Sequence, residues 1–241
     1  MSKSQAGRPG ARPKAPGQPE ILHEDNHLIV VIKPVGFLSQ ADGKDALDLV
    51  NWLKAYVKEK YSKPGEVFIG LVHRLDQPVG GVMVFARTSK AAARLSQQIR
   101  DRQMEKEYRA VVHGRPQPVE GVIQVRLVKD PSTNRVRVDP EGLASDLAYE
   151  TIGYDQASDC SLLRIRLGSG RGHQIRVSLA HAGWPIVFDQ KYGLASDRGK
   201  GDVALFASDL RFSHPTRPER LDFHADLPDQ PPFDRFHAFD V

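Results

Sequence analysis

The most informative stretch of the sequence reads Leu71-Val72-His73-Arg74-Leu75-Asp76-Gln77-Pro78-Val79-Gly80-Gly81-Val82. Apolar runs flank its charged centre on both sides, at 67–72 and 82–86, and we interpret both runs as buried strands. Binding and catalytic side chains are often found on short loops that a rigid scaffold holds in place. The loop therefore predicts a site built on a single carboxylate, which makes the two-carboxylate chemistry of glycosidases a poor fit.

The composition predicts one globular domain behind a basic N-terminal segment. The chain has 241 residues, of which 40% are hydrophobic and 27% charged, enough for a substantial core. Four of its 34 basic residues lie in 1–19, which has no acidic residue, and the rest of the chain carries 30 basic and 30 acidic residues. The segment is rich in proline and glycine and buries too little apolar surface to fold. We expect a disordered basic tail at 1–19 and one domain at 20–241.

Cysteine use and hydropathy indicate where the protein resides. Cys160 is the only cysteine, so a disulfide framework is excluded and a reducing compartment is expected. No apolar run reaches the ~20 residues of a membrane helix. The basic N-terminal end is not followed by the apolar core of a signal peptide. We therefore expect a cytoplasmic protein with no membrane partner.

Strand patterns outnumber helical ones along the chain. Helices are predicted at 46–60 with Asp45 as a candidate cap, from the cap signal Thr88-Ser89-Lys90 to about Arg102, and at 171–182. Strands are predicted at 27–32, 67–72, 82–86, 108–112, 121–128, 135–138, 148–154, 162–167 and 204–212. Several of them are joined by turns of hairpin length. The pattern favours the α+β class, with a large, mostly antiparallel (mixed) sheet and flanking helices.

Two further stretches carry candidate functional residues. Tyr108 stands at the start of a strand between cations, where it could stack on a base or simply pack on the sheet. The run from Gly168 to Val177 is a glycine-rich turn leading into a helix, whose free backbone N–H groups suit phosphate. Within it, His173 and Arg176 are three residues apart and share one helix face, so Arg176 could lie under the carboxylate of Asp76. The alternative for the first loop is that Arg74 and Asp76 only brace a turn.

Charge distribution and missing motifs narrow the function further. Between Arg87 and Arg137 the chain has 12 basic and 5 acidic residues, which suits either a nucleic-acid track or an ordinary solvated face. The motifs of P-loops and dinucleotide folds are absent, so no nucleotide cofactor is expected. The serine nucleophile elbow is absent as well, which argues against a serine nucleophile. A metal-dependent hydrolase using His73, Asp76 and His173 stays open as an alternative.

Taken together and in this order, the motifs resemble the RluA-type family of RNA pseudouridine synthases. The resemblance runs from about Pro19 to Pro215 and rests chiefly on Lys33-Pro34-Val35-Gly36, His73-Arg74-Leu75-Asp76, Glu107-Tyr108-Arg109-Ala110, Gly170-Arg171-Gly172-His173-Gln174-Ile175-Arg176, Asp189-Gln190-Lys191-Tyr192-Gly193 and Ala204-Leu205-Phe206-Ala207. It implies a catalytic domain of pseudouridine synthase fold. It also implies an isomerase that flips specific uridines out of ribosomal or transfer RNA and converts them to pseudouridine. Structured RNA is then the partner, no cofactor or metal is needed, and we expect a monomer.

The resemblance implies a role for five side chains. Asp76 matches the catalytic aspartate, and Arg176 matches the arginine that pairs with it. Arg74 matches a residue that engages RNA near the flipped nucleotide, Tyr108 matches the tyrosine that stacks on the base, and Leu205 matches an apolar residue against the base. A nearby cation favours an ionised carboxylate, whereas burial alone disfavours it. A catalytically inactive RNA-binding relative is a rival interpretation, against which the presence of Asp76, Tyr108 and Arg176 argues.

The chain also departs from the family pattern at four positions. Family members often have Thr-Ser where this chain has Val79-Gly80, Thr at the position of Gly172, and His at the position of Phe206. The 1–19 segment is too short to be the S4-type RNA-binding domain common in the family. We expect these departures to lie at or next to the cleft, to leave the reaction intact and to affect the choice of RNA.

Overall fold

The computed structural model describes residues 17–43 and 46–239, so the first 16 residues of the predicted tail and the candidate cap Asp45 lie outside the described residues. The described strands are β1 (Glu20–Glu24), β2 (Leu28–Lys33), β3 (Gly70–Leu71), β4 (Gly80–Ala86), β5 (Glu105–His113), β6 (Glu120–Asp130), β7 (Arg135–Val138), β8 (Leu143–Asp155), β9 (Cys160–Leu167), β10 (Leu205–Ser213) and β11 (Arg220–His224). The helices are α1 (Leu49–Lys60), α2 (Ser89–Arg100) and α3 (Gln174–His181), followed by 3-10 turns at Ala195–Asp197, Phe233–Arg235 and His237–Phe239. None of these helices is long and apolar enough to cross a membrane.

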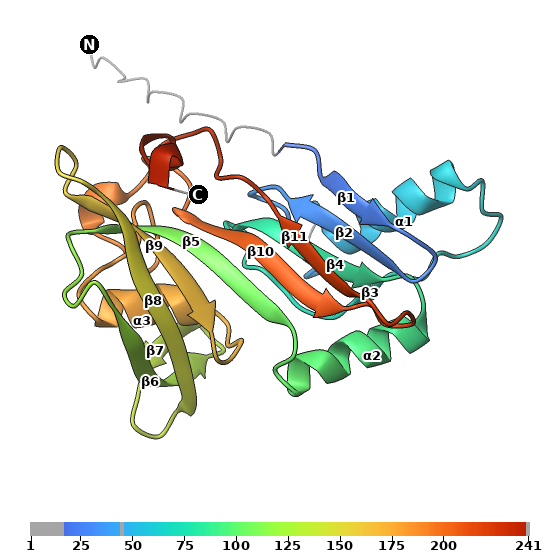
Figure 1. The fold of residues 1–241 in the computed structure, drawn as a ribbon, viewed down its shortest axis with the longest axis horizontal. Coiled ribbons are helices and arrows are strands. Elements are labelled where there is room, and N and C mark those ends of the chain that lie inside the picture. The colour runs from blue at the N-terminus through green and yellow to red at the C-terminus, as the bar shows by residue number, and fades with distance from the viewer. Residues whose placement is uncertain (1–16, 44–45, 240–241) are drawn as a thin grey trace, which may run out of the picture.

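In the described part of the chain, the strands form one sheet of eleven (Figure 1). Its order is β1-β2-β4-β10-β5-β9-β8-β6-β7, with β11 added to β10 and β3 added to β4. The β4–β10 pair is parallel, while the other pairs of described strands are antiparallel. The predicted α+β class with a mostly antiparallel sheet is confirmed.

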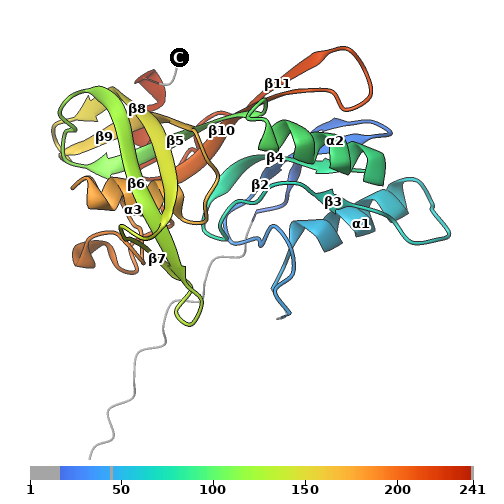
Figure 2. The same cartoon turned by 90° about the horizontal axis from the view of Figure 1, so that it is seen from below.

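The sheet has two halves that carry their helices separately. In Figure 2, α1 and α2 lie beside β2, β3 and β4, whereas α3 lies with β6 and β7 in the other half. Strands β10 and β5 join the halves, because β10 pairs with β4 on one side and with β5 on the other. Residues on the loops of each half can therefore meet above these central strands.

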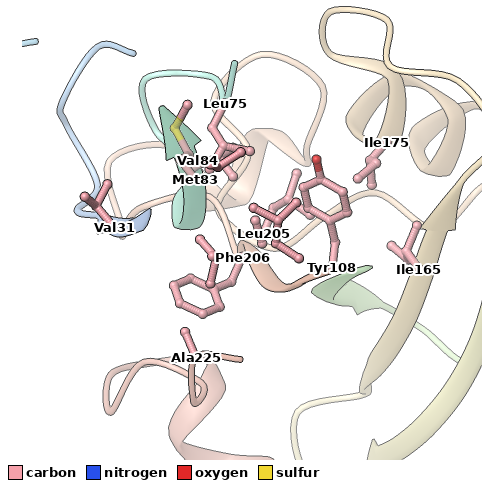
Figure 3. Packing of buried hydrophobic residues seen from close by; sticks show 14 of the residues in the cluster. Val31, Leu75, Met83, Val84, Tyr108, Ile165, Ile175, Leu205, Phe206 and Ala225 are labelled. Atoms are coloured by element: carbon pink, nitrogen blue, oxygen red, sulfur yellow. The ribbon is translucent and has the colours of Figure 1, made fainter. Parts of the chain in front are cut away.

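One apolar core runs across the junction between the halves. Strands β2 and β4 are buried almost throughout, which explains their continuous apolar sequence. Figure 3 shows the core continuing from Met83 and Val84 through Leu205 to Tyr108 and Ile165. Strand β6 instead alternates between exposed and half-buried residues, as a strand with one solvated face does.

A close approach between β4 and β10 fixes the geometry of the centre. Gly81 has a φ of 124°, in a region that disfavours side chains, and a Cβ atom at this position would overlap the backbone of Ala207. The two residues are register partners in the parallel pair. Only glycine lets the strand after the 72–79 loop come this near to β10.

The helix starts differ from the predictions at two of three places. Helix α2 begins after Thr88, whose side chain accepts a hydrogen bond from the N–H of Ala91, as predicted. The start predicted for α1 is wrong, because Asp48 is its N-cap and accepts from the N–H of Asn51. Helix α3 begins only at Gln174, since His173 has a left-handed φ of 54° that no α-helix accommodates.

The strand predictions fail where burial is incomplete. The run at 67–72 is not one buried strand: β3 has only two residues, and the side chain of Phe68 is 49% exposed. Strands β1 and β11 were not predicted as separate elements from the residue pattern. Both are short and half-exposed, so their sequences lack a continuous apolar run.

Candidate active site

Asp76 lies on the loop between β3 and β4, and hydrogen bonds to the backbone of that loop hold it in place. The Ser39 hydroxyl donates to the carbonyl of Leu75 (2.8 Å) and accepts from its N–H (3.1 Å). The N–H of Gly36 donates to the carbonyl of Gln77 (3.0 Å). The side chain of Asp76 is 25% exposed. The backbone of the loop is therefore held by residues 36 and 39, while the Asp76 carboxylate is partly exposed in a cleft.

Lys33 is a buried cation beneath the same loop. Its side chain has no exposed surface, and its Nζ donates to the carbonyls of Pro34 and Gln77, both at 3.1 Å. Burial lowers the pKa of Lys33 to about 7, and the charge of Asp76 opposes this shift only in part. The sequence placed Lys33 in a motif but gave it no role, because its burial depends on the strands packed around it.

Arg176 reaches Asp76 from the other half of the molecule. Its Nη1 donates to Oδ2 of Asp76 at 3.0 Å, inside the separation of about 4 Å expected for an ion pair. Its Nε and Nη2 donate to the two carboxylate oxygens of Asp189, each at 2.7 Å. The pairing of Arg176 with Asp76 that the resemblance implied is present, and Arg176 bridges two carboxylates.

Asp189 is a residue of the site that sequence reasoning missed. Its Oδ1 also accepts from the N–H groups of Lys191 (2.9 Å) and Tyr192 (3.1 Å). Burial by itself raises the pKa of Asp189, but the hydrogen bonds and charge of Arg176 outweigh it, so its pKa lies below the usual range. The run Asp189-Gln190-Lys191-Tyr192-Gly193 was a quoted motif of the resemblance, so the signal existed without an assigned role.

Tyr108 stands on β5 beside this pair. Its side chain is buried, and burial together with the negative charge of Asp76 raises the pKa of its phenol, which stays protonated at neutral pH. Leu205 packs beside it (Figure 3) but is not among the residues that line the cleft. Arg74 is exposed on the same loop as Asp76 and does line the cleft. Four of the five predicted residues thus line the same cleft, and the fifth, Leu205, is buried beside Tyr108.

The cleft has a volume of about 1410 Å³ and a cationic lining. Asp76, Tyr108 and Arg176 are among its lining residues. The other lysine and arginine residues that line it are Arg74, Arg102, Lys106, Lys129, Arg166, Arg171, Lys191 and Arg211. These cations come from both halves of the molecule, so the sheet assembles them around the carboxylate.

The basic segment from Arg87 to Arg137 does not form one continuous track. Of its twelve cations, Arg102, Lys106 and Lys129 line the cleft. Arg94 instead donates to the carbonyl of Pro215, and Arg109 forms a buried ion pair with Glu107 at 2.7 Å. Side chains alternate along strands and rotate around helices, so a charge count along the sequence does not give a surface.

Three of the four departures from the family pattern are packing positions. Gly172 lines the cleft as expected, but Val79, Gly80 and Phe206 are buried and absent from its lining. Gly80 and Phe206 are register partners, and a Cβ atom on Gly80 would lie 3.4 Å from the Phe206 ring. The two departures therefore fit each other, and of the four positions only Gly172 is part of the cleft lining itself.

The geometry does not favour the metal-hydrolase alternative. The ring of His73 is buried, and its Nε2 accepts a hydrogen bond from the N–H of Val84 at 3.1 Å. Among the described residues, no three His, Cys, Asp or Glu side chains are close enough together to hold a metal ion. His73 therefore bonds to the backbone of β4 and does not form a metal-ligand set with Asp76 and His173.

The comparisons with known proteins agree with this site. The model of the RNA pseudouridylate synthase family matches residues 27–181. The chain therefore belongs to the RNA pseudouridylate synthase family, and the predicted RluA-type resemblance is confirmed.

The relatives that match the chain cover most of it. It is 32% identical over 219 residues to an uncharacterized RNA pseudouridine synthase of Aquifex aeolicus, covering 87% of this chain and 69% of that protein. It is 33% identical over 218 residues to the ribosomal large subunit pseudouridine synthase C of Salmonella typhimurium, covering 86% and 66%. The chain thus spans about two thirds of the length of these relatives.

A solved structure shows the same fold. The human RNA pseudouridylate synthase domain containing 4 superposes with a TM-score of 0.73 at 24% identity, covering 91% of this chain and 90% of that one. The common architecture is the large sheet on which Asp76, Tyr108 and Arg176 are brought together in the present chain.

Proposed function

We propose that this protein isomerises specific uridines of ribosomal RNA to pseudouridine, with Asp76 as its single catalytic carboxylate. The observation that supports this most strongly is the contact of Asp76 with Arg176 at 3.0 Å, next to Tyr108 in a cation-lined cleft. The ribosomal target is inferred from relatives named for the large ribosomal subunit. Transfer RNA is the alternative target.

The reaction needs an ionised carboxylate and a base taken out of its stack. The bond between N1 of uracil and C1′ of ribose breaks, and a bond between C5 and C1′ forms. The proton lost at C5 balances the proton gained at N1, so the step consumes no oxidant or group donor. A stacked uridine cannot reach Asp76, so it must first be flipped into the cleft.

Each proposed side chain has a part in this reaction. Arg176 donates to Oδ2 of Asp76 and so directs one oxygen of this carboxylate. The ring of Tyr108 offers a flat surface for the flipped base, a stack worth roughly 1–3 kcal/mol that tolerates any base. Arg74 and the cations on the cleft walls hold phosphates and so position the RNA without reading its sequence.

The test is a map of pseudouridine in RNA from cells that lack this protein. We expect one or a few ribosomal sites to be lost, and to be restored by the wild type but not by Asp76→Asn. In single-turnover assays Asp76→Asn should be slower by at least about 10³-fold, within the range that general acid–base groups contribute. Asp202→Asn, at another carboxylate that lines the cleft, is the matched control and should remain active.

The possible outcomes distinguish an error about the RNA target from an error about the enzymatic activity. Loss of transfer-RNA sites alone would replace the ribosomal target and keep the synthase. Normal turnover by Asp76→Asn, or an unchanged map without the protein, would overturn the proposed function. Loss of the folded state in Asp76→Asn would return Asp76 to a structural role.

We further propose that one catalytic domain, 20–241, acts as a monomer in the cytoplasm. Asp76, Tyr108 and Arg176 meet within a single chain, so no second copy is required to complete the site. Light scattering of the pure protein with and without RNA tests this. A stable dimer, or a fluorescent fusion found outside the cytoplasm, would contradict it.

A further inference from the structure

We propose that His173 is a positioning residue for Asp76, and that Tyr192 fixes its imidazole as the Nε2–H tautomer. Nε2 of His173 lies 3.8 Å from Oδ2 of Asp76, and Nδ1 lies 2.7 Å from the Tyr192 hydroxyl. The inference deepens the proposed function and rests on it, because it concerns the same carboxylate. None of the roles assigned above includes His173 or Tyr192.

The backbone at His173 is held so that its ring can reach across the cleft. The residue precedes α3 with a left-handed φ of 54°, a conformation that is sparsely populated by residues other than glycine. The next side chain secures this turn: Gln174 accepts from the hydroxyl of Ser169 (2.9 Å) and from the N–H of Arg171 (3.0 Å). It also donates to the carbonyl of Asp146 at 2.9 Å. These three hydrogen bonds of Gln174 therefore hold the turn in its left-handed conformation.

The tautomer follows from the partners of the two ring nitrogens. The Tyr192 oxygen accepts a hydrogen bond from the N–H of Val136 at 2.9 Å, and its own proton is left to donate to Nδ1 of His173. Nε2 faces the negative carboxylate of Asp76, where a proton is favourable and a lone pair is not. Burial lowers the pKa of His173, so the ring is neutral at neutral pH.

A second donor is useful because Arg176 holds Asp76 by one contact only. Two of its three nitrogens bond to Asp189, and the remaining Nη1 reaches Asp76. A carboxylate held by a single hydrogen bond can rotate about it. A second donor on the same oxygen, Oδ2, prevents that rotation and leaves Oδ1, which has no protein donor among the described residues, for the reacting atoms.

Substrate binding completes the contact. A separation of 3.8 Å is too long for a direct hydrogen bond. Catalytic contacts are often long without substrate and shorten in the complex. The side chain of His173 is only 11% exposed, so RNA that fills the cleft excludes water from this gap. Tyr192 also packs its ring on Arg176, with the guanidinium carbon 5.2 Å from the ring centroid, so one residue supports both donors.

The test compares two substitutions that share the same backbone cost. His173→Gln retains an N–H donor near the position of Nε2, while His173→Leu has none, and both place a new side chain in the left-handed turn. We expect His173→Leu to lower the single-turnover rate by roughly 10- to 100-fold, the size of one hydrogen bond to a charged group, and His173→Gln to restore most of it. The affinity for RNA should stay within about twofold, because no phosphate contact is removed.

Tyr192→Phe tests the tautomer separately. It retains the ring on Arg176 and removes the hydroxyl, so its rate should fall partway. Combined with His173→Leu it should add no further loss, as expected for two residues that act through one contact. Nitrogen-15 NMR of labelled histidine should show the proton on Nε2 in the wild type and a mixture of tautomers in Tyr192→Phe. His181→Gln, at an exposed histidine of the same helix, is the control and should change nothing.

Clear outcomes overturn the proposal. Equal rates for His173→Leu and His173→Gln, or a proton on Nδ1 in the wild type, would show that His173 does not position Asp76 in this way. A wild-type rate in His173→Leu together with an inactive Asp76→Asn would reject this inference and keep the proposed function. An active Asp76→Asn would reject the proposed function first.

Discussion

The two sides of the cleft are built on different principles. The carboxylate side, residues 33–39 and 72–79, places Asp76 on buried apolar strands through hydrogen bonds that Ser39 and Gly36 make to the backbone of its loop. The arginine side, residues 168–176 and 186–193, places Arg176 through side chains that bond to one another. Even the position of Asp189 on this side depends on a short contact with β5, in which Val187 donates to the carbonyl of Val111 at 2.9 Å.

The difference shows how each charge is stabilised. Asp76 is one-quarter exposed, so solvent shares its charge and its loop needs only a fixed backbone. Arg176 is 3% exposed, and a buried charge must be paired and fully hydrogen-bonded. On the carboxylate side, the hydrogen bonds end on backbone atoms of the loop, which carry no charge. On the arginine side, removing one partner of the Arg176–Asp189 pair leaves the other charge buried and unpaired. The arginine side is thus where single substitutions should be most damaging to the fold.

The largest expected effect on stability is that of Arg176→Met. Removing the guanidinium leaves the carboxylate of Asp189 buried without its cation, which should destabilise the fold by about 3–5 kcal/mol. Urea denaturation followed by circular dichroism measures the loss. The double variant Arg176→Met/Asp189→Leu removes both charges, so it should regain much of the stability and still be inactive.

These two variants test the comparison between the sides directly. If Arg176→Met is as stable as the wild type, the arginine side does not depend on compensated charge. If the double variant is active, Arg176 is not needed for Asp76 to work, and the contact at 3.0 Å has no role in turnover.

Tyr108 lies between the two sides and should affect RNA binding without a proton-transfer role. Tyr108→Phe should bind RNA as the wild type does, and Tyr108→Leu, which loses the flat ring, should bind more weakly by roughly 1–3 kcal/mol. Fluorescence anisotropy with a labelled RNA target measures both affinities, at a temperature where thermal melts show both variants folded. Equal affinities for the two variants would remove stacking as its function.

Cations that line the cleft should contribute more to the affinity for RNA than exposed cations that lie outside it. Lys129→Glu combined with Arg171→Glu changes two exposed cations that line the cleft. In a plot of the logarithm of affinity against the logarithm of salt concentration, the slope should become shallower by up to about 1.4. Each phosphate contact with a single strand contributes about 0.7 to this slope.

The matched control for this pair is Arg100→Glu combined with Arg115→Glu, two exposed cations outside the cleft lining. Its salt dependence should stay near that of the wild type. A larger effect from the control pair would mean that the RNA follows the outer face of the sheet rather than the cleft.

The carboxylate side contains one buried cation, and pH should reveal it. The pKa of Lys33 is about 7 in the folded protein and near 10.5 when unfolded, so between these values the unfolded chain binds more protons. Stability should therefore rise with pH across this window and level off on either side. Lys33→Met should lack this rise, with a slope smaller by up to about 1.4 kcal/mol per pH unit.

Denaturant unfolding at pH 7, 8, 9 and 10 measures the slopes. Groups that titrate in both proteins cancel in the difference, and Lys90→Met, at an exposed lysine, provides the control. Parallel slopes for Lys33→Met and the wild type would show that burial does not lower the pKa of Lys33 in the folded protein.

Much of the fold and part of the site can be predicted from the sequence. The apolar run of β4, the cap at Thr88 and the α+β class follow from local patterns, because these report burial and backbone preference. Asp76, Tyr108 and Arg176 stand in motifs whose order and type indicate a site even before distances are known.

Which of these groups come into contact depends on how the strands pack against one another. Asp76 and Arg176 are 100 residues apart, and their contact exists because β4, β10 and β5 lie side by side, with Gly81 permitting the closest approach. The partner of Arg176, the tautomer of His173 and the choice of cations that face the cleft depend on the same packing. The type of a residue determines which chemistry its side chain can perform. The packing of the sheet determines which other side chains are near enough to take part.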